Sequence, residues 1–138
     1  MVRINLINPK KLADQHLIAE YNEILMLLGY VKKYPRLTNI PEGYALGKGH
    51  IRFFKNKLLY LKRRHEILKI EMKKRGFATN IVINLDRFSN ELINDWQPKA
   101  RDYEVIKKRL IEKFHLKPNY YKYYKEYKDK EFFIGLLR

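Results

Sequence analysis

Cysteine is absent from the chain, and this excludes disulfide bonds, thiol catalysis and cysteine-ligated zinc. Long apolar runs are absent as well, since none approaches the roughly 20 residues that a membrane-spanning helix needs. The first residues also lack the hydrophobic core of a signal peptide. We therefore expect a soluble, intracellular and cytoplasmic protein that does not engage a membrane.

Acidic residues are scarce relative to basic ones. The chain has 15 Asp and Glu against 30 Lys and Arg, a net charge of +15 in 138 residues. Such a charge attracts polyanions, and tyrosines interleaved with lysines favour nucleic acid over a membrane surface. The length suits one domain with a single core, and we treat residues 1–138 as that domain because no linker or internal repeat is visible.

The first predicted helix has two possible start signals. Asn8 followed by Pro9 offers a capping side chain and a proline in the first turn, and Asp14 offers a second possible cap. Apolar residues then recur at spacings of four and three, which places them on one helix face. They are Leu17, Tyr21, Ile24, Leu28 and Val31.

Two further helices are predicted from the same kind of spacing. One runs over about residues 50–75, where an apolar three–four repeat is unbroken and Gly76 follows as a C-cap. The other runs over about residues 99–116 and ends before Pro118. These patterns predict an all-α fold, a single compact domain of three long helices with extended loops and an aromatic C-terminal tail.

The segments between the helices carry weaker signals. Residues 34–49 are rich in proline and glycine, which is typical of a loop. Residues 77–98 are irregular, although Ile81, Val82 and Ile83 favour a short strand with no evident partner. Residues 126–138 form a C-terminal extension that we expect to pack on the core through its phenylalanines.

The start of the chain offers reactive groups. Removal of Met1 would leave a free α-amine on Val2, beside Arg3. An α-amine has a pKa of about 7.7–8.0, so a useful fraction is neutral and nucleophilic at neutral pH, and nearby cations lower that pKa further. Together with a carboxylate such as Glu23 on the first helix, this amine is a minimal set for imine chemistry on a sugar aldehyde.

Three blocks in the right order resemble one family, the pyrimidine-dimer DNA glycosylases, small phage-type endonucleases that nick ultraviolet-damaged DNA. The blocks are Val2-Arg3-Ile4-Asn5-Leu6 with Leu12-Ala13-Asp14-Gln15-His16-Leu17, Leu46-Gly47-Lys48-Gly49-His50 with Lys73, Arg75-Gly76-Phe77, and Arg109-Leu110, Glu112-Lys113 with Tyr121-Lys122-Tyr123-Tyr124. The matches cover about two-thirds of the chain. They weaken in residues 34–45 and 77–95.

The resemblance implies a bifunctional DNA glycosylase and abasic-site lyase acting on pyrimidine dimers in duplex DNA. It implies that the amine of Val2 is the nucleophile and that Glu23 is the essential carboxylate. It implies expulsion of the base opposite the lesion and no cofactor. The four histidines show no metal-ligand spacing, so no metal site is predicted, and we expect a monomer.

The resemblance and the basic and aromatic positions together give the predicted DNA contacts. They are Arg3, Gln15, His16, Asn22, Lys48, His50, Arg109, Lys113, Lys117, Tyr121, Lys122, Tyr123 and Tyr124. Several have a structural alternative. His50 could instead cap or pack its helix, the basic row on the third helix could be a solvated face, and some of the tyrosines could be core.

Three positions depart from the family. Asn22 and Met26 stand where the family typically has arginines on the first helix, and Val2 stands where threonine is commoner. Two other functions therefore stay open. One is a non-catalytic, basic nucleic-acid-binding protein, and the other is a glycosylase and lyase of the same fold that acts on a different damaged base.

Overall fold

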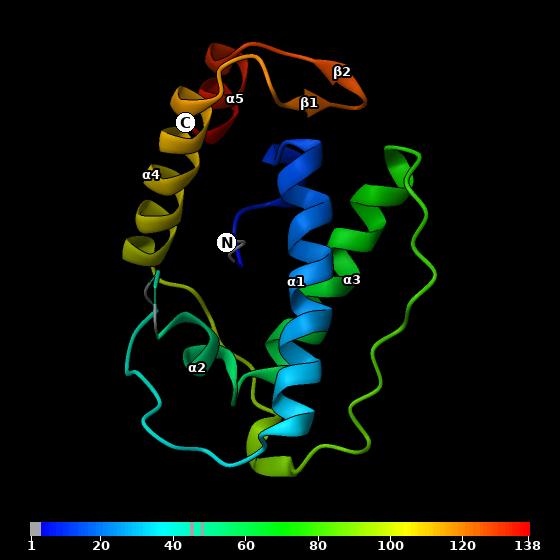
Figure 1. The fold of residues 1–138 in the computed structure, drawn as a ribbon, viewed down its shortest axis with the longest axis vertical. Helices are drawn as coiled ribbons and strands as arrows, with labels where there is room; N and C mark the ends of the chain where they lie inside the picture. Colours follow the sequence, from blue (N-terminus) through cyan, green and yellow to red (C-terminus); the bar gives the residue numbers. More distant parts are fainter. Residues whose placement is uncertain (1–3, 45, 48) are drawn as a thin grey trace.

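The fold is built on three long helices, as the sequence predicts. The computed structural model describes residues 4–44, 46–47 and 49–138. Its elements are η1 (Pro9–Lys11), α1 (Asp14–Lys33), α2 (His50–Phe54), α3 (Leu58–Lys74), η2 (Asn90–Leu92), α4 (Ala100–Leu116), β1 (Lys122–Tyr123), β2 (Glu126–Tyr127) and α5 (Lys130–Leu137). Figure 1 shows α1 against α3 with α4 to one side. No helix in these ranges is long and apolar enough to cross a membrane.

The two predicted start signals lie at the starts of two elements, but only Asn8 acts as a cap. The Asn8 side chain accepts a hydrogen bond from the backbone N–H of Lys10 and caps η1, which opens at Pro9. The α-helix proper begins at Asp14, with Ala13 rather than Asp14 as its N-cap. All five residues of the predicted apolar face of α1 are buried, so the periodicity identified the core side correctly.

The predicted single helix over residues 50–75 is divided into α2 and α3. The apolar repeat does not reveal this break, because Phe54 and Leu58 on its two sides enter the same core. Asn94 compensates for the interrupted helix, since its side-chain amide donates to the backbone carbonyl of Asn56 and its own carbonyl accepts from the N–H of Tyr60. The partner that stabilises the break is therefore distant in sequence.

The end of α3 follows the sequence signal. Gly76 has φ +85°, the left-handed region that suits glycine after a helix, and the N–H of Phe77 bonds back to the carbonyl of Met72. Residues 77–89 then run without a strand, so the predicted strand at residues 81–83 is wrong, although Ile83 is buried.

The C-terminal segment is more ordered than the sequence predicts. A short antiparallel hairpin, β1 with β2, precedes α5, and the Asp129 side chain caps α5 by accepting from the N–H of Phe132. Phe133 is buried and stacks on Phe114 of α4, with ring centroids 4.9 Å apart. The expected packing of residues 126–138 on the core is confirmed.

A buried arginine joins the two ends of this framework. The Arg75 guanidinium donates to Glu71 and to Asp14, both at 2.9 Å, and to the backbone carbonyls of Leu12 at 2.7 Å and Pro9 at 3.1 Å. The side chain is fully buried. Because the guanidinium charge strengthens each of these bonds, the cluster fixes the end of α3 against the start of α1.

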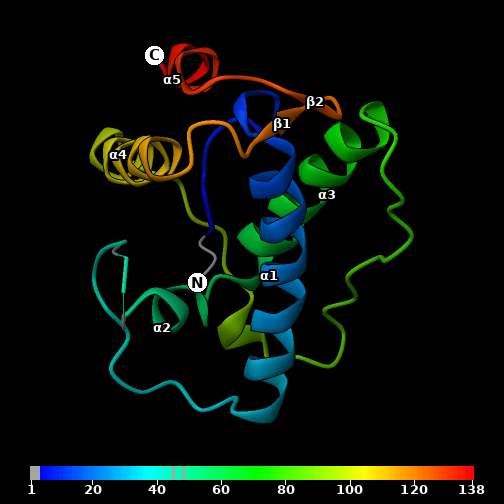
Figure 2. The same ribbon diagram turned by 45° about the horizontal axis from the view of Figure 1, so that its top comes forward.

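The hairpin attaches to the same cluster. The Asp14 carboxylate accepts from the backbone N–H groups of Tyr124 and Lys125, at 3.1 and 2.7 Å. Both residues have positive φ, 51° and 68°, a backbone conformation that residues other than glycine rarely adopt. The bonds from Asp14 therefore stabilise a turn that is intrinsically unfavourable. The Tyr124 hydroxyl donates to Glu71, and the guanidinium lies 4.5 Å from the Tyr123 ring centroid. Figure 2 shows the hairpin over the start of α1.

Candidate active site and nucleic-acid interface

The N-terminal arm is held at Ile4 by two side chains from residues 44–50. The backbone N–H of Ile4 donates to Nε2 of His50 at 3.0 Å, and its carbonyl accepts from the hydroxyl of Tyr44 at 2.9 Å. All three residues are buried. His50 therefore has the packing role that the sequence left as an alternative, and its contact with DNA stays a prediction.

A tight turn follows the clamp. Leu6 has φ +63°, and the N–H of Ile7 donates to the carbonyl of Asn5 across it at 2.6 Å. A bulky residue in this region is strained. Both Leu6 and Ile7 are buried, so apolar burial offsets the strain and directs the chain into η1. Val2, Arg3 and Lys48, three of the predicted site residues, lie outside the described residues.

The arm lies beside the middle of α1. Figures 1 and 2 both place the start of the described arm next to the central turns of that helix. Glu23 is the tenth of the 20 residues of α1 and is half-buried, while its neighbour Asn22 is exposed. The predicted carboxylate and the segment that leads to the predicted amine therefore occupy one region of the molecule.

A second glutamate of α1 has a structural partner. Glu20 is fully buried and forms a bidentate pair with Arg64 of α3, Nε to Oε2 at 2.5 Å and Nη2 to Oε1 at 3.0 Å. Burial alone would lower the pKa of Arg64, but the charge and hydrogen bonds of Glu20 raise it above its usual value. The pair crosslinks α1 and α3 on a face of α1 that neighbours the face carrying Glu23.

Gln15 connects the start of α1 to the aromatic tail. Its side-chain amide donates to the carbonyl of Tyr120 at 2.9 Å, and its side-chain oxygen accepts from the N–H of Lys122 at 3.0 Å. Gln15 is half-buried. Its predicted contact with phosphate or sugar stays a prediction, and the structure gives it a second role in positioning the tail.

His16 is enclosed by aromatic rings. Its ring centroid lies 4.7 Å from that of Tyr121 and 5.3 Å from that of Phe114. Burial, and secondly the nearby Lys113 cation, lower the pKa of His16 to about 3, so the ring is neutral at pH 7. Its ring nitrogens have no hydrogen-bond partner within the described ranges. Such nitrogens are available to a polar ligand only if the rings around them move apart.

The basic row of α4 borders this corner. Arg109 and Lys113 are half-buried, and Lys117 is exposed with its ammonium 4.6 Å from the Tyr120 ring centroid. Burial raises the pKa of the Tyr121 hydroxyl, while the charge of Arg109 acts in the opposite direction. The structure thus brings the row of α4 together with the start of α1, and phosphate binding by these cations stays a prediction.

The tyrosines of the tail divide by environment. Tyr121 is buried in the aromatic group of His16, Tyr123 is half-buried against Arg75, and Tyr124 is exposed while bonded to Glu71. Lys122 lies with its ammonium 4.7 Å from the Tyr127 ring centroid. Some rings pack as core, as expected, whereas a tyrosine that faces DNA stays a prediction.

Sequence reasoning missed the residues that hold the site together. Nothing in their spacing distinguished Tyr44 within a loop, or Arg64 on a basic helix. Arg75 follows two other basic residues at the end of α3, where cations suit the helix dipole, so its position in the sequence does not reveal a structural role. The two residues of α1 that replace arginines of the family lie at the surface instead. Asn22 is exposed, and Met26 is 69% exposed.

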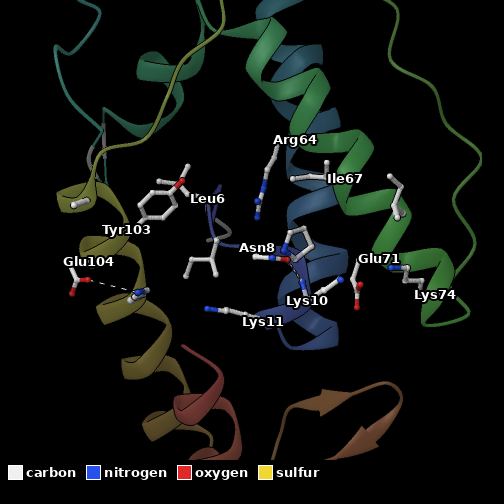
Figure 3. Close-up of a pocket in the computed structure, with 15 residues that line it drawn as sticks. Leu6, Asn8, Lys10, Lys11, Arg64, Ile67, Glu71, Lys74, Tyr103 and Glu104 are labelled. Atoms are coloured by element: carbon white, nitrogen blue, oxygen red, sulfur yellow. Dashed lines mark hydrogen bonds and ion pairs between the residues drawn. The ribbon is translucent and has the colours of Figure 1, made fainter. Parts of the chain in front are cut away.

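A groove opens on the face of the arm that points away from the exposed side of α1. Its volume is about 780 Å³, and it lies between α3 and α4 over residues 6–11. Figure 1 views α1 in front of α3, whereas Figure 3 views α3 in front of α1, so the groove faces away from the exposed side of α1. No group of three metal-ligating side chains occurs in the described part of the chain.

A comparison with known families matches most of the described helical framework. The model of a family described as pyrimidine dimer DNA glycosylase matches residues 1–85. This stretch contains the arm, α1, both clamp residues, α2 and α3, while α4 and the aromatic tail follow it.

Proposed function

Because the chain belongs to the pyrimidine dimer DNA glycosylase family, we propose that it releases a base of the dimer from duplex DNA and then cuts the strand at the abasic site. The family supplies the glycosylase activity and the damaged DNA substrate. The observation that carries the finer proposal is the clamped arm beside the central turns of α1, the helix that carries the half-buried Glu23.

The nucleophile in this proposal is the α-amine of Val2. Two residues span at most about 7 Å, so the amine stays within that distance of the clamped backbone N–H of Ile4. A neutral amine is available near neutral pH because the pKa of an α-amine is about 7.7–8.0. Its lone pair attacks C1′ of the damaged nucleotide, and the glycosidic bond breaks with its electron pair passing to the departing base.

Glu23 has an electrostatic role in this step. The sugar gains positive charge as the base departs, and a nearby carboxylate stabilises such an oxocarbenium-like transition state. Half-burial suits that role, since a carboxylate partly withdrawn from water interacts more strongly with a developing charge. Glu20 cannot substitute for it, because Arg64 already binds both of its oxygens.

Strand cleavage then uses the covalent intermediate. Loss of a proton from the amine nitrogen and opening of the sugar ring give an imine at C1′, which makes the C2′ proton acidic. Glu23, or a water that it assists, removes that proton. The electron pair left on C2′ forms a C2′–C3′ double bond as the 3′ phosphate leaves, which completes β-elimination without a cofactor.

The basic and aromatic corner would bind the duplex. Lys113, Lys117 and Arg109 contact phosphates in this proposal, and an exposed ring of the tail faces the distorted site. The protein acts as a monomer and extrudes the base opposite the lesion, at a cost of a few kcal/mol that is smaller where a dimer already stacks poorly. Residues 86–138 belong to the same domain, because the tail is bonded to Asp14.

Borohydride reduction on an abasic-site duplex tests the proposal. We expect a covalent protein–DNA adduct whose crosslink maps by mass spectrometry to a peptide beginning at Val2. Protein that retains Met1 is the matched control and should give no adduct. Absence of any adduct with the processed protein would favour a non-catalytic nucleic-acid-binding protein. Trapping on the abasic duplex without release from dimer DNA would favour a different damaged base.

A further inference from the structure

The groove behind the arm has an apolar end and a cationic end. Along the arm, Leu6 precedes Lys10 and Lys11, and along α3, Ile67 precedes Lys74. Figure 3 places Leu6 and Ile67 in the upper part of the groove and the three lysines in the lower part. The arm and α3 therefore run from apolar to cationic in the same direction. On α4, Tyr103 precedes Lys107 in the same order.

The apolar end of the groove contains isoleucines that are exposed to solvent. Ile67 is 44% exposed and Ile70 is 57% exposed, and both line the groove. A smaller cavity of about 260 Å³ shares Leu6 and Ile67 and adds Tyr60 and Pro98 to the apolar lining. Adjacent exposed isoleucines in a concavity of this size are typical of a site that buries an apolar ligand.

The charges at the two ends differ in how they are compensated. Near the apolar end, Arg64 is paired with Glu20, and Arg63 is paired with Asp95. Near the other end, Lys107 has only a 3.9 Å contact with Glu104.

The remaining charges of the lining complete this contrast. Glu71 is occupied by Arg75 and Tyr124. Lys10, Lys11 and Lys74 have no acidic partner within the ranges that the structure describes. The uncompensated positive charge therefore lies at one end only.

We propose that this groove binds a soluble, single-chain amphiphilic anion. Its anionic head group lies among Lys10, Lys11 and Lys74, and its apolar chain lies along Ile70, Ile67 and Leu6. The distance from Ile67 to Lys74 along the axis of α3 is about 10 Å, which suits a medium-length chain. The inference does not depend on the glycosylase chemistry, because the groove is on the opposite face of the arm.

Decanoate, titrated by calorimetry into the full chain, is the first probe. We expect saturable one-to-one binding with a dissociation constant below about 1 mM. Decanol, which has the same chain without the charge, should bind at least fivefold more weakly. No saturable decanoate binding, or equal affinity for decanol, would overturn the proposal.

Two variants locate the site, each with a matched control. Lys74→Glu should weaken decanoate binding at least fivefold, whereas Lys73→Glu makes the same charge change on an exposed lysine of α3 outside the lining and should leave the affinity within twofold. Ile70→Asn should weaken binding at least tenfold. Val82→Asn, at a 75% exposed position elsewhere, should not change it.

The variants are exposed residues, and thermal melting of each confirms that the fold is retained. Equal losses in Lys74→Glu and Lys73→Glu would mean that general charge attracts the anion, and this would overturn the proposal. Co-sedimentation with phosphatidylglycerol vesicles tests a membrane surface as the source of the head group. Loss of vesicle binding in Lys74→Glu without loss of decanoate binding would also overturn it.

Discussion

Glu20 and Glu23 are three residues apart on α1 and have different environments. Glu20 faces α3, is fully buried and has both oxygens bound by Arg64. Glu23 is on a neighbouring face of the same helix and is half-buried. The difference arises because three residues turn a helix by about 300°, so identical side chains reach different neighbours. One carboxylate holds helices together, and the other remains near solvent where a substrate can approach.

The comparison predicts the largest effect at Glu20. Glu20→Ala leaves the Arg64 cation buried without its partner, and breaking a buried pair in this way costs about 3–5 kcal/mol. We expect that loss in the free energy of unfolding, measured with denaturant. The double variant Glu20→Leu with Arg64→Met should recover most of the stability. A single variant as stable as the parent would show that the pair is not a structural crosslink.

The second prediction concerns Glu23 and its activity. Glu23→Gln removes a charge but little volume, so melting temperature and binding to lesion DNA should stay close to the parent. Release of the damaged base should fall at least about a hundredfold, the usual scale for losing such a group. Single-turnover assays measure this fall. Equal cleavage by parent and variant would remove Glu23 from the chemistry and end its contrast with Glu20.

The third prediction concerns His16, an enclosed side chain of α1 whose protonation depends on pH. The pKa of His16 is lowered to about 3 by burial and by Lys113, against an ordinary value of 6.5. The unfolded chain therefore binds the proton first, so stability is complete above pH 6.5 and falls as the pH decreases. The contribution of His16 to that fall is about 2 kcal/mol between pH 6.5 and 5.

His16→Phe keeps a ring in the aromatic group and removes the titration. Denaturant unfolding at pH 7.5, 6 and 5 should show a shallower pH dependence in this variant than in the parent. An identical pH dependence would mean that the pKa of His16 is close to its ordinary value in the folded protein, and hence that burial does not lower it.

The smallest predicted effect is at the surface of α4. Arg109→Ala and Lys113→Ala should each weaken binding to damaged and intact duplex alike. Each should also reduce the slope of log affinity against log salt by about one, since one phosphate contact contributes roughly 0.9. Lys73→Ala, an exposed lysine on α3, is the control. An unchanged slope in both variants would mean that this face of α4 is solvated and does not bind DNA.

The sequence predicted the elements of the fold better than their connections. The periodicity of apolar residues located α1 and α4 and the end of α3 at Gly76. It missed the break before Leu58, because the repeat continues through it and the compensating hydrogen bonds come from Asn94. The hairpin was missed because its turn depends on Asp14, whose carboxylate is far away in sequence.

The candidate site shows the same division. The resemblance predicts roles for Glu23 and the basic row of α4 from their positions along the chain, and these roles stay predictions. It did not identify the clamp on Ile4, because a loop tyrosine and a helix-opening histidine have many ordinary roles. Side chains that position a reactive group act through tertiary contacts, and spacing along a single sequence carries little information about those contacts.

The cluster around Arg75 has a consequence for biosynthesis. It joins residues near position 9, near 75 and near 124, so the beginning of the chain acquires its final partners only when the end has been made. At a synthesis rate of about 5–20 residues per second, the arm emerges roughly 5–20 s before Tyr124. A nascent chain can therefore form the clamp on Ile4 and the Arg75 bonds to Pro9 and Asp14, whereas the second set of bonds to Asp14 waits until Tyr124 and Lys125 have been made.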